Sequence, residues 1–268
     1  MKSFNFRIII IFLIASLISL ALNAQWNRRY EVLSRYHRLA FIAGPVVYNK
    51  AKLTPQYGDY TFTNKPIWGF NAGLEYDFFP DRKWSLVSGL FLAYEPVFNL
   101  EYTIKKEDIY PDYTEDSEGE DKMYANPSFS VPVLAKLNIQ AGEKMFLYFI
   151  SGIKLMYFPP GGATLSVIYR NEDNTEAKEV FGIIADSPDN AIQGSFEIGT
   201  GVSIPLKRFL IKSSLIYVIN FQNTIEGEYQ FGNLSVSPPS SGYYELSGNY
   251  LGLMISASLA RKKHQKFE

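Results

Sequence analysis

Residues 67–79 read Ile67-Trp68-Gly69-Phe70-Asn71-Ala72-Gly73-Leu74-Glu75-Tyr76-Asp77-Phe78-Phe79. Successive side chains of a β-strand point to opposite faces, so every second residue shares a face. One face here is apolar and carries aromatic rings at both ends, whereas the other is small or polar. Trp and Tyr favour the two membrane–water interfaces, so this pattern is typical of a strand that crosses a bilayer.

The same pattern returns directly after a turn at residues 80–82, over residues 84–94. The two segments together predict a transmembrane β-hairpin. Aromatic side chains on the apolar faces of these and later strands are expected to form a lipid-facing belt: Trp68, Phe70, Tyr76, Phe78, Trp84, Tyr94, Tyr157 and Tyr217.

Six more segments alternate in this way, at residues 38–48, 129–139, 145–158, 195–204, 209–221 and 251–260. Strands of about ten residues match a tilted bilayer crossing. The connections alternate between long and short, as expected for short periplasmic turns and long extracellular loops. The predicted fold is all-β, an eight-stranded antiparallel up-and-down transmembrane β-barrel.

A soluble eight-stranded barrel of the lipocalin type is the alternative, with its apolar face turned inward to a ligand. Its outer face would be in water and would need many Lys and Glu residues on each strand. The strands here carry only one or two charges each, which favours the membrane barrel.

The chain begins with the features of a signal peptide. Lys2 and Arg7 precede an apolar run over residues 8–22, and Ala24 offers a cleavage point. The run is short for a membrane-spanning helix. We therefore expect a cleaved signal peptide at 1–24, a periplasmic segment at 25–37, the barrel at 38–261 and a basic tail at 262–268. The predicted location is the outer membrane of a Gram-negative bacterium.

Charged residues occupy the minor face of several strands and are expected to point into the barrel. An eight-stranded barrel is only wide enough inside for side chains to fill it, and charges buried there must be paired. The sequence thus predicts a closed polar lumen rather than a pore. The expected ion-pair network consists of Glu75, Glu95, Glu197, Lys136, Lys154 and Lys212.

Composition argues against several classes of function. Lys and Arg number 26 against 27 Asp and Glu, so no basic footprint for nucleic acid is present. The chain has no Cys, and its two histidines, His37 and His264, fall outside the predicted strands. No nucleotide-binding or hydrolase motif occurs. We therefore predict no enzymatic activity, catalytic residue, cofactor or metal, although Ca²⁺ binding by the acidic residues 107–121 stays open.

Aromatic residues in the predicted outer loops suggest two interpretations. They could form a binding surface, or they could be the solvated ends of extended hairpins. The residues concerned are Tyr102, Tyr110, Tyr113, Tyr124, Tyr229, Phe231, Tyr243 and Tyr244.

The signal ending Asn23-Ala24-Gln25, the strand at residues 73–78 and the eight-strand layout are similar to small outer-membrane barrels of the OmpA/OmpX type. More closely, they resemble the PorT-like outer-membrane barrels of Bacteroidetes, some of which assist secretion systems. The chain departs from the usual barrel pattern because a basic tail, not a terminal aromatic, follows the last strand. The resemblance implies an architecture and transfers no catalytic residue.

The expected function is a non-enzymatic, porin-like protein of the cell envelope, embedded in outer-membrane lipid, whose extracellular loops contact a partner or surface. The alternatives are an accessory subunit of a secretion or assembly complex, a lipid-modifying barrel enzyme, a narrow channel, and the soluble lipocalin-like binder.

Overall fold

The computed structural model describes residues 30–142, 145–188 and 191–261. The predicted signal peptide, the start of the segment at 25–37 and the basic tail lie outside these residues. Eight strands form a closed antiparallel barrel in the order β5-β4-β1-β14-β11-β10-β7-β6, with β6 pairing back to β5. The barrel strands are β1 Leu39–Tyr48, β4 Ile67–Asp77, β5 Trp84–Ile104, β6 Ser117–Gln140, β7 Phe146–Tyr157, β10 Ile192–Pro205, β11 Phe209–Asn220 and β14 Tyr250–Leu259. The predicted fold class is confirmed.

The register follows the alternation read from the sequence. In β4 and β5, Leu74 lies opposite Leu90 on the outer face, and Glu75 lies opposite Gly89 on the inner face. Large apolar side chains cover the barrel exterior, including Phe41, Phe149 and Ile255. No helix within the described residues is long and apolar enough to span a bilayer.

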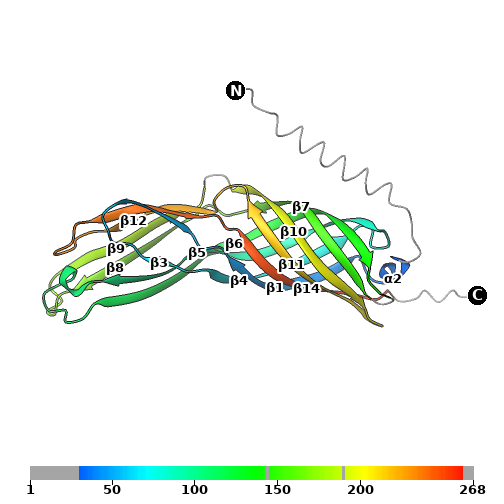
Figure 1. Cartoon of the computed structure of the whole chain (residues 1–268), viewed down its shortest axis with the longest axis horizontal. Coiled ribbons are helices and arrows are strands. Elements are labelled where there is room, and N and C mark those ends of the chain that lie inside the picture. Colours follow the sequence, from blue (N-terminus) through cyan, green and yellow to red (C-terminus); the bar gives the residue numbers. More distant parts are fainter. Residues whose placement is uncertain (1–29, 143–144, 189–190, 262–268) are drawn as a thin grey trace, which may run out of the picture.

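The two ends of the barrel differ (Figure 1). Short turns join β4 to β5, β6 to β7 and β10 to β11, and we call this the turn end. At the other end β5 and β6 continue as one long hairpin of 21 and 24 residues. The expectation of about ten residues per strand is therefore wrong for these two. A strand can extend beyond a membrane whenever it finds a partner, and each is the other's partner as far as Ile104 and Ser117.

The other long connections are also mainly strands, not loops. They contain β2 Lys52–Tyr57, β3 Thr63–Asn64, β8 Gly162–Arg170, β9 Ala177–Asp186, β12 Ile225–Phe231 and β13 Ser240–Leu246. Five of them form a separate sheet in the order β2-β13-β12-β9-β8. This sheet faces β3 and the outer parts of β5 and β6, and we call the two layers the head.

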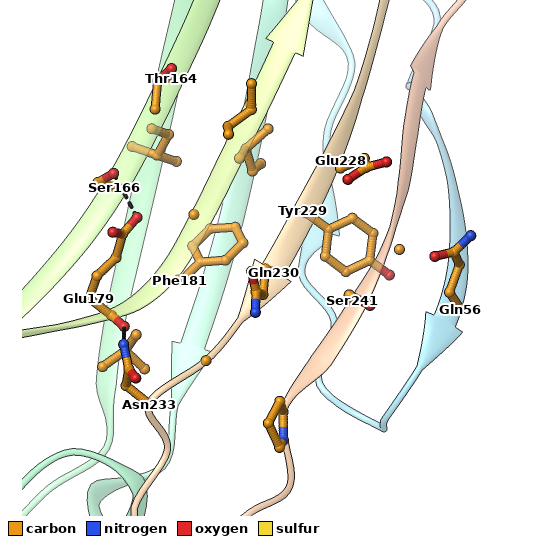
Figure 2. A pocket seen from close by; sticks show the side chains of 18 residues that line it. Gln56, Thr164, Ser166, Glu179, Phe181, Glu228, Tyr229, Gln230, Asn233 and Ser241 are labelled. Carbon is orange, nitrogen blue, oxygen red and sulfur yellow. Dashed lines mark hydrogen bonds between the residues drawn. The ribbon is translucent and has the colours of Figure 1, made fainter.

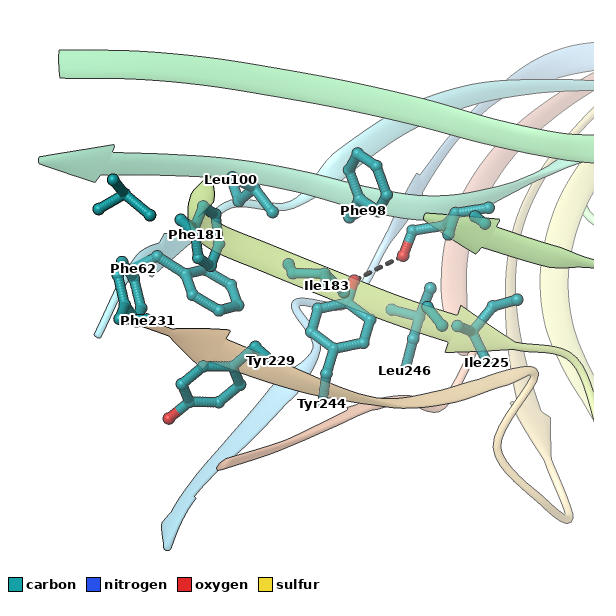
Figure 3. Close-up of a cluster of buried hydrophobic side chains, with 14 of the residues drawn as sticks. Phe62, Phe98, Leu100, Phe181, Ile183, Ile225, Tyr229, Phe231, Tyr244 and Leu246 are labelled. Atoms are coloured by element: carbon teal, nitrogen blue, oxygen red, sulfur yellow. Dashed lines mark hydrogen bonds between the residues drawn. The ribbon is translucent and has the colours of Figure 1, made fainter. Parts of the chain in front are cut away.

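A hydrophobic core of its own fills the head (Figure 3). Phe181 of β9 stacks on Phe231 of β12 with ring centroids 4.4 Å apart, and Phe62 packs edge-on against Tyr229 at 5.1 Å. The Tyr244 hydroxyl donates a hydrogen bond of 2.6 Å to the carbonyl of Val97 in the opposite layer. Burial of this much aromatic surface stabilises the folded head.

The turn end is closed by the residues that precede β1. Helix α2 (Glu31–Ser34) buries Leu33 beside Tyr30, Tyr36, Phe146 and Leu210. The Tyr30 hydroxyl donates to the carbonyl of Asn138, and the Tyr36 hydroxyl donates to the carbonyl of Leu206. The described part of the predicted periplasmic segment therefore packs against the barrel instead of hanging free.

Candidate functional site

Two ion pairs lie in the half of the barrel near the turn end. Lys212 of β11 contacts Glu75 of β4 at 2.6 Å, and Lys136 of β6 contacts Asp77 of β4 at 2.7 Å. All four side chains are largely shielded from water. Asp77 was not part of the predicted network, because its position near a strand end suggested a rim. Asp77 is nevertheless buried, and Ser85 donates a hydrogen bond to it.

The remaining predicted network residues lie toward the head. Lys154 of β7 approaches Glu197 of β10 at 4.0 Å and donates a hydrogen bond to the Tyr250 hydroxyl. Glu95 of β5 is 2 % exposed and accepts a hydrogen bond of 2.7 Å from Ser128. The structure thus places all six predicted charges inside the barrel, in two separate groups.

The interior is not purely polar, which differs from the prediction. Between the two groups of charges, Ile42, Val87, Leu134, Ile216 and Met254 form an apolar cluster with neighbouring tyrosines. Branched side chains at inward positions fill the space that Glu and Lys leave. The cavity that this cluster and the neighbouring charged side chains line has a volume of only about 20 Å³, which is room for about one water molecule.

The predicted belt residues all point outward or lie at the barrel surface. Trp68, Phe70, Tyr94 and Tyr157 are exposed toward the head end. Tyr217 is partly buried, as are the three belt residues near the turn end, Tyr76, Phe78 and Trp84. Tyr76 packs edge-on against Phe78 at 4.9 Å.

The head carries a pocket on the outward face of its five-stranded sheet (Figure 2). Its volume is about 780 Å³, within the range of small-molecule sites. Ser166, Glu179, Gln230, Asn233 and Ser241 contribute polar side chains to its lining. Ser166 donates a hydrogen bond of 2.7 Å to Glu179, and Asn233 donates one of 2.9 Å to the Glu179 carbonyl.

Sequence reasoning missed this pocket. The strict alternation of residues 225–231, Ile-Glu-Gly-Glu-Tyr-Gln-Phe, indicates a strand inside one of the predicted outer loops. Neither interpretation of the loop aromatics holds for Tyr229, Phe231 and Tyr244, which are buried in the head core. Tyr243, which directly precedes Tyr244 in β13, is exposed.

The acidic residues at 107–121 do not form one loop. Residues 117–121 belong to β6, and Asp108 is buried. Among the described residues, no cluster of Asp, Glu and His has the geometry to hold a metal ion.

Asp108 instead joins three segments at the tip of the head. Its carboxylate accepts hydrogen bonds from the Tyr60 hydroxyl at 2.5 Å, the Ser237 amide at 2.6 Å, the Ser237 hydroxyl at 2.7 Å and the Val236 amide at 3.0 Å. Burial raises the pKa of Asp108, but these hydrogen bonds outweigh it and hold the pKa below the usual 3.8. Burial and the Asp108 contact raise the pKa of Tyr60 to about 12, so Tyr60 stays a donor.

This carboxylate makes the stability of the tip depend on pH. A depressed pKa in the folded state gives a stabilisation that is complete above the unfolded pKa of 3.8 and lost as pH falls through the lower folded value. We expect amide exchange at Val236 and Ser237, corrected for the intrinsic rate, to accelerate in that acidic window. Asp108→Asn should accelerate it at neutral pH by the equivalent of about 1–3 kcal/mol. Asp173→Asn, on an exposed turn, is the control, and equal protection in both variants would contradict the assignment.

Comparison with known proteins gives distant structural similarity only. No known protein family matches the chain, and no curated protein matches it. Among solved structures, the outer membrane protein OprG from Pseudomonas aeruginosa is 10% identical, with 85% of this chain and 99% of that chain covered and a TM-score of 0.39. The attachment invasion locus protein Ail of Yersinia pestis is 12% identical over 83% of this chain and 98% of that chain, with a TM-score of 0.30. The toluene transporter TodX of Pseudomonas putida is 9% identical over 84% and 90%, with a TM-score of 0.24. These scores are low, so the fold rests on the strand pairing of this chain.

Proposed function

We propose that this chain is an integral outer-membrane protein whose filled barrel is an anchor and whose rigid extracellular head binds a ligand or partner without catalysing a reaction. The observation that carries the proposal is the contrast between the two halves. The cavity inside the barrel measures only about 20 Å³, whereas the head presents a pocket of about 780 Å³. In this proposal the predicted signal peptide exports the chain, and the turn end faces the periplasm.

The apolar exterior supports the membrane location. Closed barrels leave no unpaired strand edge in lipid, and an outward apolar band flanked by aromatics is their usual surface. In water, side chains such as Phe41, Leu74 and Leu215 would be exposed to solvent, whereas in a membrane lipid covers them. A Bacteroidetes origin and a role beside a secretion complex remain proposals that rest on the sequence resemblance.

Conductance across a planar bilayer tests the closed anchor. We expect the refolded full chain to insert and remain electrically silent, because the ion pairs and apolar cluster leave no continuous water path. Incorporation is verified on the same sample by heat-modifiable migration on a gel. Reproducible step currents from the inserted protein would overturn the proposal in favour of a channel.

Two substitutions test which face meets lipid. Leu90 of β5 is 53 % exposed on the outer face, whereas Ala93 is 8 % exposed and faces inward. Leu90→Arg should cost about 2–4 kcal/mol of folding free energy in lipid vesicles if Leu90 lies near the bilayer midplane. Ala93→Ser should cost little, because a hydroxyl fits a partly polar interior. The measurement is the urea midpoint of the gel shift, and equal midpoints for both variants would rule out this orientation.

A further inference from the structure

The outward face of the five-stranded sheet has its side chains arranged in rows by strand register. Ser166 of β8, Gly182 of β9, Gln230 of β12 and Ser241 of β13 are successive cross-strand neighbours. Gly182 has no side chain, so the backbone is uncovered there, and polar side chains stand on both sides of it. Across these four strands, which are spaced by about 4.8 Å, the groove along this row extends about 14 Å.

The neighbouring row gives the groove an apolar ledge. Ile184 of β9 and Tyr243 of β13 flank Glu228 of β12 in register. Ile184 and Tyr243 are 62 % and 42 % exposed. Two solvent-exposed apolar groups beside a polar groove match a ligand with both a hydroxylated edge and an apolar face.

The polar groups are free to bind. Within the described residues, the side chains of Glu228, Gln230 and Ser241 have no intramolecular hydrogen bond, and they lie around the hollow in Figure 2. Amides and hydroxyls donate and accept, and carboxylates accept, so together they suit pairs of hydroxyl groups. The described lining contains no Lys, Arg or His, which disfavours phosphate, sulfate and acidic ligands.

The groove is also held rigidly. Its strands present Phe181, Ile183 and Tyr229 to the head core on the opposite face. A preformed site loses little conformational entropy when it binds. We propose that this groove is a binding site for a neutral oligosaccharide, a ligand class that rests on the proposed role of the head as the binding part.

Isothermal titration calorimetry on the refolded full chain in detergent tests the proposal. The probes are neutral hexasaccharides, namely maltohexaose, cellohexaose and chitohexaose, with hexagalacturonate as the acidic arm and a Gly-Ser hexapeptide as the peptide arm. We expect saturable binding of at least one neutral hexasaccharide and none of the other two arms. Gly182→Leu and Gln230→Ala should each weaken binding by about tenfold or more. A side chain at 182 meets only the end of the Glu179 side chain within 3 Å, so the first variant can fold.

Gly142→Leu is the matched control, because that turn glycine has open space around it and lies at the other end of the barrel. Its binding should equal that of the natural chain. Absence of binding by every neutral hexasaccharide, binding of the peptide or the acidic sugar instead, or equal loss in the Gly142 variant would overturn the ligand class. The bilayer conductance experiment tests the proposed function separately. If the inserted protein gives no current, the anchor-and-head function still holds without this ligand class, whereas step currents would contradict that function.

Discussion

Phe181→Ala is expected to loosen the head while the barrel remains folded. The Phe181 ring stacks on Phe231 and also contacts Phe62 and Tyr102, with centroids 5.5 and 5.2 Å away. Removing a fully buried phenyl ring leaves a cavity and costs about 3–5 kcal/mol. The barrel has separate clusters of buried residues, so its stability should change little.

Limited proteolysis and near-ultraviolet circular dichroism report on the head, and heat-modifiable migration reports on the barrel. In Phe181→Ala we expect rapid cleavage within the head strands and a weaker aromatic signal, with an unchanged gel shift. Ile168→Ala is the control, because Ile168 is exposed on the outward face of the same sheet. Equal cleavage of the two variants would show that the aromatic cluster does not hold the head together.

Lys212→Met should destabilise the barrel by about 3–5 kcal/mol, because it leaves the buried Glu75 carboxylate without its cation. The contact of 2.6 Å joins β11 to β4 across the interior. The double variant with Glu75→Gln removes both charges and should recover much of the loss. If the salt bridge did not contribute to stability, the double variant would not recover the lost folding free energy.

The urea midpoint of the gel shift in lipid vesicles measures both variants. Lys207→Met, in the exposed turn between β10 and β11, controls for the loss of one positive charge. If the double variant is as unstable as Lys212→Met, the pair is not coupled and the network interpretation fails for these residues.

The two halves of the molecule differ in how far the sequence predicts them. Each barrel strand can be predicted from its own residues. Alternation alone predicts that Leu90 faces outward and Ala93 inward, because lipid and lumen favour opposite side-chain chemistry at neighbouring positions. The same alternation predicts that Glu75, Lys136 and Lys212 point into the barrel, without any knowledge of which charges pair. It could not show that Lys136 would select Asp77, since partner choice depends on the stagger between β4 and β6.

The sequence by itself therefore determined the barrel, its strand count, its apolar exterior and the inward charges, because period-two patterning is a property of consecutive residues. Only the tertiary structure decided the head and its groove. Phe62, Phe181 and Phe231 come from three separate connections. Alternation predicts the hairpin that contains Phe181, but it does not show that Phe62 and Phe231 pack against that hairpin. Gly182 is one glycine among many in the sequence, and it becomes the floor of a groove only because register sets it between Ser166 and Gln230. Contacts between distant segments leave no periodic signal in the chain, so the part of the molecule proposed to bind was visible only once the strands were paired.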